Sequence, residues 1–186
     1  YVVNPDDSAV TVIDGLTNAT TTVAVGQNPN DVAVNPVTNK VYVANSGSNN
    51  VTVIDGATNA TTLVPTGTGL IAVMVNPVTN KVYVMNGQGG DVTVIDGATN
   101  ATTSVPAGNF PALAAVNPVT NKVYVANLFG NDVTVITDAP VNDTKVRAAF
   151  DRLPGDTTTL ARPALTGKGV NRWAPGHTAM MGVLNR

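Results

Sequence analysis

A block of eleven residues recurs three times, and this repetition constrains the fold more than any other feature of the chain. "NPVTNKVYVAN" occupies residues 35–45, returns as "NPVTNKVYVMN" at 76–86, and returns again at 117–127, so the step is 41 residues each time. The flanking words keep the same step: "VIDG" ends at Gly15, Gly56 and Gly97, and "TNATT" begins at Thr17, Thr58 and Thr99. A period in the forties that contains several short strands is typical of a β-propeller blade or another stacked β repeat.

Each unit predicts four strands with a turn signal at every break. In the second unit we expect strands over residues 31–35, 40–45, 50–55 and 60–64. These runs are rich in valine and tyrosine, which favour strands, and Asn-Pro and Gly/Ser/Asn clusters separate them. Apolar side chains stand at adjacent positions in "KVYVAN" and "VTVI", so both faces of each sheet must be covered. Blades that pack face to face provide that cover.

The repeated words resemble the YVTN β-propeller repeats of surface-layer and other exported proteins. The resemblance is carried by "NPVTNKVYVANSGSNNVTVIDGATNATTLVPTG" at 35–67 and its copy at 76–108, and it extends over about residues 1–137. It implies a seven-bladed propeller at the cell surface or outside the cell. Seven units of 41 residues would need 287 residues, whereas the chain has 186.

The fold class that follows is all-β, a β-propeller built of four-stranded antiparallel blades that this chain alone leaves incomplete. We count three strands before Gly26, two complete units, and three strands up to Ile136, which makes 14 strands. Exposed strand edges and an apolar blade face need cover. Three arrangements supply it: the chain is a segment of a longer protein, the tail closes a small four-bladed ring, or two chains pair as a homodimer whose 28 strands equal seven blades.

The tail, residues 138–186, differs in composition from the blades over residues 1–137. It carries seven of the ten lysines and arginines, whereas residues 1–136 carry three lysines and eight aspartates. A short helix is predicted over about 143–153, and "DTTTLARP" at 156–163 echoes "NATTLVP" at 59–65, which indicates degenerate blade strands. The cations are spread out without an array of aromatic residues, so no nucleic-acid partner is predicted.

The residue types that usually carry catalysis are scarce. The chain has no cysteine and no glutamate, and His177 is its only histidine, so we predict no catalytic residue, no metal site and no cofactor. Asp14, Asp55 and Asp96 precede glycine at the end of a strand, where a carboxylate can accept turn amides; their spacing lacks the dense oxygen ligands of a calcium loop. Trp173 and His177 flank Pro175-Gly176 and are the binding candidates.

Two further patterns concern glycosylation and membrane insertion. "NAT" at Asn18, Asn59 and Asn100, "NVT" at Asn50 and "NDT" at Asn142 fit the N-glycosylation pattern, although turns and strands already account for four of them. No run of 18 apolar residues is present, so no membrane span is predicted.

Two classes of function remain. The first is a non-catalytic extracellular or cell-surface scaffold that presents its loops to a protein or glycan partner. The second is a fragment of a propeller enzyme of the lactonase or lyase type. An enzyme needs unlike residues at equivalent positions of different blades, whereas these blades are almost identical, so the scaffold is favoured. For either class we expect Tyr42 and Tyr83 to be buried between blades.

Overall fold

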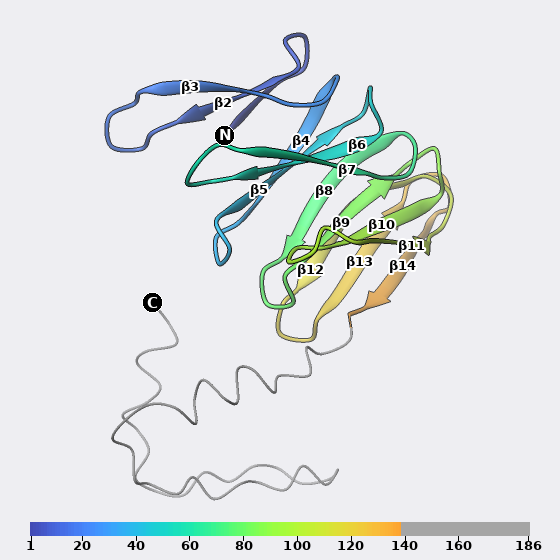
Figure 1. Ribbon diagram of the computed structural model, residues 1–186. Helices are drawn as coiled ribbons and strands as arrows, with labels where there is room; N and C mark the ends of the chain where they lie inside the picture. Colours follow the sequence, from blue (N-terminus) through green and yellow to red (C-terminus); the bar gives the residue numbers. More distant parts are fainter. Residues whose placement is uncertain (139–186) are drawn as a thin grey trace, which may run out of the picture. The chain divides into compact units, whose positions relative to one another are not determined.

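The computed structural model describes residues 1–138, which form fourteen strands and no helix. The strands are β1 (Val2–Asn4), β2 (Ala9–Ile13), β3 (Thr20–Ala24), β4 (Pro29–Asn35), β5 (Lys40–Asn45), β6 (Asn50–Asp55), β7 (Thr61–Pro65), β8 (Leu70–Asn76), β9 (Lys81–Asn86), β10 (Asp91–Asp96), β11 (Thr102–Pro106), β12 (Pro111–Asn117), β13 (Lys122–Asn127) and β14 (Asp132–Thr137) (Figure 1). The predicted all-β class and the predicted strand order are therefore confirmed for these residues.

The strands make four antiparallel sheets in which each strand pairs with its neighbours in sequence. We name them the first sheet (β1–β3), the second sheet (β4–β7), the third sheet (β8–β11) and the last sheet (β12–β14). Two of them have four strands and the two at the ends have three. This arrangement is consistent with propeller blades.

Equivalent residues pair in the same register in successive sheets. Tyr42 lies opposite Val53, Tyr83 opposite Val94, and Tyr124 opposite Val135. The first strand of the second sheet, β4, begins at Pro29, two residues earlier than predicted, because Pro29 pairs with Asn45 before a bulge. A proline is tolerated at the first residue of a strand, where its missing N–H costs no ladder bond.

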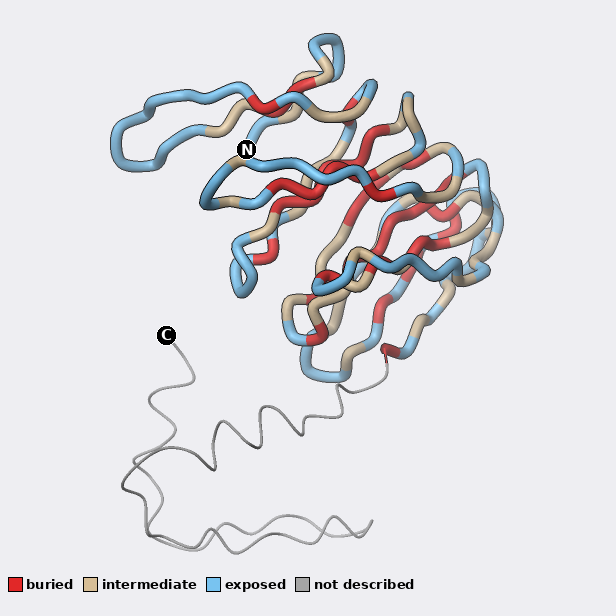
Figure 2. Tube along the Cα trace, in the orientation of Figure 1, coloured by how far each residue is buried: buried red, intermediate tan, exposed pale blue. Residues whose placement is uncertain are grey.

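The core lies between the sheets, as the adjacent apolar positions predicted. Tyr42 and Tyr83 are 0% and 1% exposed, which confirms their predicted burial. Tyr42 packs in one cluster with Val82, Val84 and Ile95 of the third sheet, while Val41, Val43 and Ile54 on the other face of the second sheet pack against Val10 and Val23. Figure 2 shows the buried residues concentrated in the second and third sheets.

The last sheet departs from this pattern. Along β13 buried and exposed residues alternate, so that Val123 and Val125 are buried while Tyr124 is exposed. Within residues 1–138 this sheet is therefore covered on one face only, and the expectation that both faces are covered holds for the second and third sheets alone.

Several sequence predictions lie outside the described residues. They are the helix over 143–153, the strand echo at 156–163, and the binding candidates Trp173 and His177. Among residues 1–138 no helix is long and apolar enough to cross a membrane.

Candidate functional site

Repeated loops gather at one end of the sheets, which we call the NPVTN end. It comprises the loops between the first and second strands of a sheet (36–39, 77–80 and 118–121) and the loops between the third and fourth strands (56–60 and 97–101). Each NPVTN loop is closed by its leading asparagine. The Asn35 Oδ1 accepts the backbone N–H of Val37 at 3.1 Å, as Asn76 Oδ1 does from Val78 at 3.1 Å and Asn117 Oδ1 from Val119 at 3.0 Å.

This closure turns one valine of every loop toward solvent. Val37, Val78 and Val119 are 75%, 58% and 90% exposed. Val78 belongs to the third sheet, which is covered on both faces, so its exposure is a property of the loop rather than of an uncovered sheet. The NPVTN end therefore presents the same apolar side chain three times.

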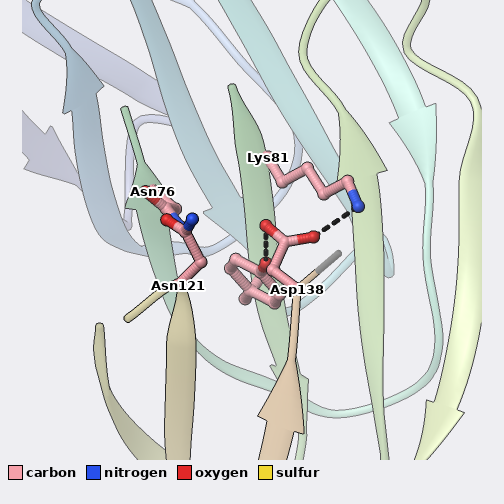
Figure 3. A network of polar contacts seen from close by, with 5 residues as sticks. Asn76, Lys81, Asn121 and Asp138 are labelled. Atoms are coloured by element: carbon pink, nitrogen blue, oxygen red, sulfur yellow. Dashed lines mark hydrogen bonds and ion pairs between the residues drawn. The ribbon is translucent and has the colours of Figure 1, made fainter. Parts of the chain in front are cut away.

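Asparagine pairs connect neighbouring loops. The Asn35 amide nitrogen donates to Asn80 Oδ1 at 2.9 Å. The Asn76 amide nitrogen donates to Asn121 Oδ1 at 3.4 Å, and Figure 3 shows this second pair. Asn80 and Asn121 end their loops in the left-handed region, with φ of 53° and 52°, a conformation that asparagine tolerates better than most residues. The loops are thus held at fixed positions relative to one another.

The repeated aspartates close the other loops at this end. The Asp55 Oδ1 accepts the backbone N–H of Ala57 at 3.0 Å, that of Thr58 at 2.9 Å, and the Thr58 hydroxyl at 2.9 Å. These bonds stabilise the carboxylate and lower the pKa of Asp55, with the Thr58 hydroxyl as the largest contributor. Asp14 and Asp96 make the same bonds, so the predicted turn role is confirmed. Residues 1–138 contain no group of three or more His, Cys, Asp or Glu side chains that could hold a metal ion.

A buried polar cluster joins the third and last sheets at the same end. The Lys81 ammonium forms an ion pair with Asp138 Oδ1, and the Tyr83 hydroxyl donates to Asp138 Oδ2 at 2.7 Å (Figure 3). Burial disfavours the Asp138 carboxylate, but the hydrogen bonds from Lys81 and Tyr83 and the positive charge of Lys81 outweigh it and lower its pKa. Burial and the bond to Asp138 raise the pKa of Tyr83 well above its ordinary value. At neutral pH Asp138 is therefore a carboxylate and Tyr83 a neutral phenol.

The cluster lines a cleft of about 430 Å³ whose walls also include Thr103, Val105 and Ile136. A general base needs a carboxylate that is free to take a proton near neutral pH. Asp138 instead has a lowered pKa and its two oxygens are occupied by Lys81 and Tyr83. The geometry suits a junction between sheets better than proton transfer.

Sequence reasoning missed Asp138, although a signal was present. The word "VIDG" of the earlier units becomes "VITD" at 135–138, so an aspartate stands where Gly56 and Gly97 stand in the repeat. Against near-identical copies, one charged replacement is informative. The backbone role is retained, because the Asp138 N–H donates to the Asn121 carbonyl as the Gly97 N–H does to Asn80.

A second missed feature is an apolar cluster at the opposite end of the last sheet. The rings of Phe110 and Phe129 lie 4.7 Å apart, and Leu128 and Phe129 are exposed. Phe110 has a φ of 60° at the position that Asn28 and Gly69 occupy in the earlier sheets. A bulky residue in the left-handed region costs about 1–2 kcal/mol relative to the right-handed one, so the phenylalanine is a marked departure from the repeat.

The asparagines of the glycosylation pattern have clear structural roles. Asn18, Asn59 and Asn100 adopt φ of 58°, 59° and 62° in the aspartate-closed turns, and Asn50 begins β6. The structure therefore explains these four asparagines by turn and strand formation, and Asn142 lies outside the described residues.

Comparisons with known proteins inform the fold. No protein-family model matches the chain, and no curated protein matches its sequence. Among solved structures it is similar to hydrazine synthase of Kuenenia stuttgartiensis, with a TM-score of 0.60 and 20% identity, and to a proposed 6-phosphogluconolactonase of Bacteroides uniformis, with a TM-score of 0.58 and 12% identity. Each alignment covers 72% of this chain and 45% of the other. At these identities the likeness shows a propeller-like fold alone, and the chain spans less than half the length of either structure.

Proposed function

We propose that the chain is a non-catalytic β-propeller scaffold of the YVTN type, located at the cell surface or outside the cell, that binds a protein or glycan partner through its NPVTN end. The observation that carries the proposal is the solvent exposure of Val37, Val78 and Val119 at one position of three successive sheets. Sequence resemblance to the YVTN repeats supports the location.

Three identical contacts suit a partner that is itself repetitive. Each valine offers a small apolar area, so one loop binds weakly. Loops that are fixed relative to one another bind such a partner together, and their combined affinity can exceed that of one loop by about 100-fold to 10,000-fold. The Asn35 to Asn80 and Asn76 to Asn121 bonds supply that fixed spacing.

The test is retention on isolated cell envelopes of the organism that encodes the chain. The wild-type chain should co-sediment with envelopes, and a variant with Val37→Thr, Val78→Thr and Val119→Thr should not, because each loop loses its apolar contact while its backbone bonds are kept. Leu63→Thr is the matched control, since Leu63 is also exposed but lies in the middle of the strand β7 rather than in a loop. Envelopes stripped of protein and envelopes stripped of glycan identify which of the two is bound. Equal retention of the triple variant would show that the loops do not bind.

The alternative is a fragment of a propeller enzyme of the lactonase or lyase type. Structural likeness to a proposed 6-phosphogluconolactonase supports it at the level of the fold. Hydrolysis of 6-phosphogluconolactone and related aldonolactones, followed by acid release, is the direct assay. If the wild-type chain hydrolysed a lactone and the Asp138→Asn and Lys81→Met variants did not, the chain would be part of an enzyme and the scaffold proposal would be wrong.

A further inference from the structure

Three apolar side chains lie together at the end of the sheets opposite the NPVTN end. They are Ile71, Phe110 and Phe129, which we call the aromatic patch. The rings of Phe110 and Phe129 lie 4.7 Å apart. A methyl group on Gly87 would lie 2.8 Å from Ile71 Cγ1 and 3.2 Å from Phe110 Cζ, so both side chains lie against the same glycine. The aromatic patch therefore spans the third and last sheets.

The exposure of Phe129 is a property of its loop. Phe129 is 62% exposed. Gly47 and Gln88 occupy the same position of the repeat, and both are exposed although the second and third sheets are covered on both faces. Leu128 is not counted in the aromatic patch, because its equivalent Gly87 is buried and lies against Phe110 of the following sheet. The side chain of Phe129 thus faces solvent whether or not another sheet follows.

Phe110 departs from the repeat at a cost to the backbone. Asn28, Gly69 and Phe110 share one position and have φ of 50°, 68° and 60°. Glycine and asparagine adopt this left-handed conformation readily, whereas a bulky side chain is strained there. Strained residues cluster at sites that bind ligands, so the phenylalanine indicates a role other than folding.

Aspartates accompany the aromatic patch. Asp91 and Asp132 begin the third strand of the third and last sheets, whereas the second sheet has Asn50 at this position. A methyl group on Gly89 would lie 2.7 Å from Asp91 Oδ1, and one on Gly130 would lie 2.8 Å from Asp132 Oδ1. Each carboxylate therefore lies beside a loop at the same end as the aromatic patch.

The positive charges lie at the other end. The lysines of residues 1–138 each begin the second strand of a sheet at the NPVTN end, and these residues contain no arginine (Lys40, Lys81 and Lys122). Within residues 1–138 the one ion pair joins Lys81 to Asp138, so neither Asp91 nor Asp132 is paired with a cation there. Aromatic faces and carboxylates both attract cations. This end therefore suits a ligand that carries an apolar group and a positive charge.

We propose that the aromatic patch binds a segment of a partner protein in which an apolar side chain stands next to arginine or lysine. The apolar side chain packs against Phe110 and Phe129, and the cation is attracted by the ring of Phe129 and by Asp132. The second sheet has Asn28, Gly47 and Asn50 at the equivalent positions and offers no such surface. The proposal is independent of any partner at the NPVTN end.

Binding of the full 186-residue chain to a peptide array tests the proposal. Each peptide carries leucine, phenylalanine or tryptophan at its centre, flanked by arginines in one series, by glycines in a second and by glutamates in a third. The wild-type chain should bind the arginine series, and it should bind the glutamate series at least about tenfold more weakly because the aspartates repel it. Asp132→Asn should weaken binding to the arginine series and leave the glycine series unchanged.

The repeat itself supplies the matched variants for the rings. Phe110→Asn and Phe129→Gln restore the residue types of Asn28 and Gln88, and each should weaken binding to the arginine series by at least about tenfold. Phe110→Asn should also raise the thermal unfolding midpoint, because asparagine tolerates the left-handed backbone. A residue that serves only the fold would not show this opposition of binding and stability.

Three results would overturn the proposal. The first is that the wild-type chain binds no series, or binds the arginine and glutamate series equally. The second is that Phe110→Asn and Phe129→Gln together leave binding unchanged. The third is that the wild-type chain binds no peptide but co-sediments with neutral phosphatidylcholine vesicles through Phe129, which would show a membrane surface as the partner. The triple Val37→Thr, Val78→Thr and Val119→Thr variant should bind peptides as wild type does, which separates this surface from the NPVTN end.

Discussion

Two junctions between neighbouring sheets have a lysine and a tyrosine at equivalent positions, but these side chains have different hydrogen-bond partners. Between the second and third sheets, Lys40 donates to the Gly97 carbonyl, and the buried hydroxyl of Tyr42 has no hydrogen-bond partner among residues 1–138. Between the third and last sheets, Lys81 and Tyr83 both bond to the carboxylate of Asp138. Apolar packing is common to both junctions, so the comparison isolates what one aspartate adds to a repeated interface.

The difference shows that the repeat specifies the apolar packing of the tyrosine ring but not an acceptor for its hydroxyl. A buried phenol without a partner costs about 1–3 kcal/mol relative to one that is hydrogen-bonded. The repeat accepts this cost at Tyr42, whereas Asp138 removes it at Tyr83. Removing the ring, the aspartate and the hydroxyl in turn therefore separates the contributions of packing and of hydrogen bonding to the free energy of unfolding.

The largest effect is expected from removing either ring. Tyr42→Ala and Tyr83→Ala should each lower the free energy of unfolding by about 3 kcal/mol, because both rings are fully buried in the core. Urea denaturation followed by circular dichroism measures the loss. A loss below about 1 kcal/mol at either position would contradict the assignment of these rings to the core.

Removing Asp138 should affect only the junction between the third and last sheets. Asp138→Ala leaves the Tyr83 hydroxyl and the Lys81 ammonium without their acceptor, and we expect a loss of about 1–3 kcal/mol. Thermal unfolding of Asp138→Ala and of the conservative Asp138→Asn, whose amide oxygen still accepts a bond, gives the comparison. If both variants were as stable as wild type, the cluster would contribute nothing to the junction.

Removing only the hydroxyl should distinguish the two tyrosines. Tyr83→Phe breaks the bond to Asp138 and should cost about 1 kcal/mol. Tyr42→Phe deletes a buried hydroxyl that has no hydrogen-bond partner in the described part of the chain, and it should be neutral or stabilising. Both variants are compared by equilibrium unfolding under the same conditions, and equal losses would mean that the partner of the hydroxyl is irrelevant.

The Asp138 contribution should also depend on pH with a definite sign. The pKa of Asp138 is lowered in the folded state, so the carboxylate stabilises the fold above its unfolded pKa of about 3.9. This contribution should be lost as the pH falls from about 4 through the folded pKa. The stability difference between wild type and Asp138→Asn should therefore be constant near neutral pH and shrink below about pH 4. A difference that grew with acid would reverse the sign of the shift.

The smallest effect is expected at the exposed turn that Asp55 closes. Asp55→Ala removes three hydrogen bonds from one loop and should lower the unfolding midpoint slightly, whereas Asp55→Asn keeps an acceptor and should lower it less. Differential scanning calorimetry in the presence and absence of calcium checks the reason. If calcium raised the unfolding midpoint of the wild-type chain and not that of Asp55→Ala, Asp55 would bind a metal ion rather than only close the turn.

The candidate site was only partly predictable from sequence. The turn role of Asp14, Asp55 and Asp96 follows from local chemistry, since an aspartate before glycine can accept amides two and three residues ahead. Asp138 and Phe110 depart from the 41-residue repeat in the sequence, but only the structure shows which side chains they contact. Their partners, Lys81 and Phe129, are distant in sequence or lie on a different loop, and no local pattern joins them.

The sequence by itself determined the strands and their order, because a 41-residue repeat of β-branched and aromatic residues between turn signals repeats the same local physics. It also determined that Tyr42 and Tyr83 are buried. Only the tertiary structure decided that Tyr124, with identical neighbours in "KVYVAN", remains exposed. Burial depends on what lies across the face of a sheet, and a strand of the same sequence is a core element when another sheet covers it and a surface when none does.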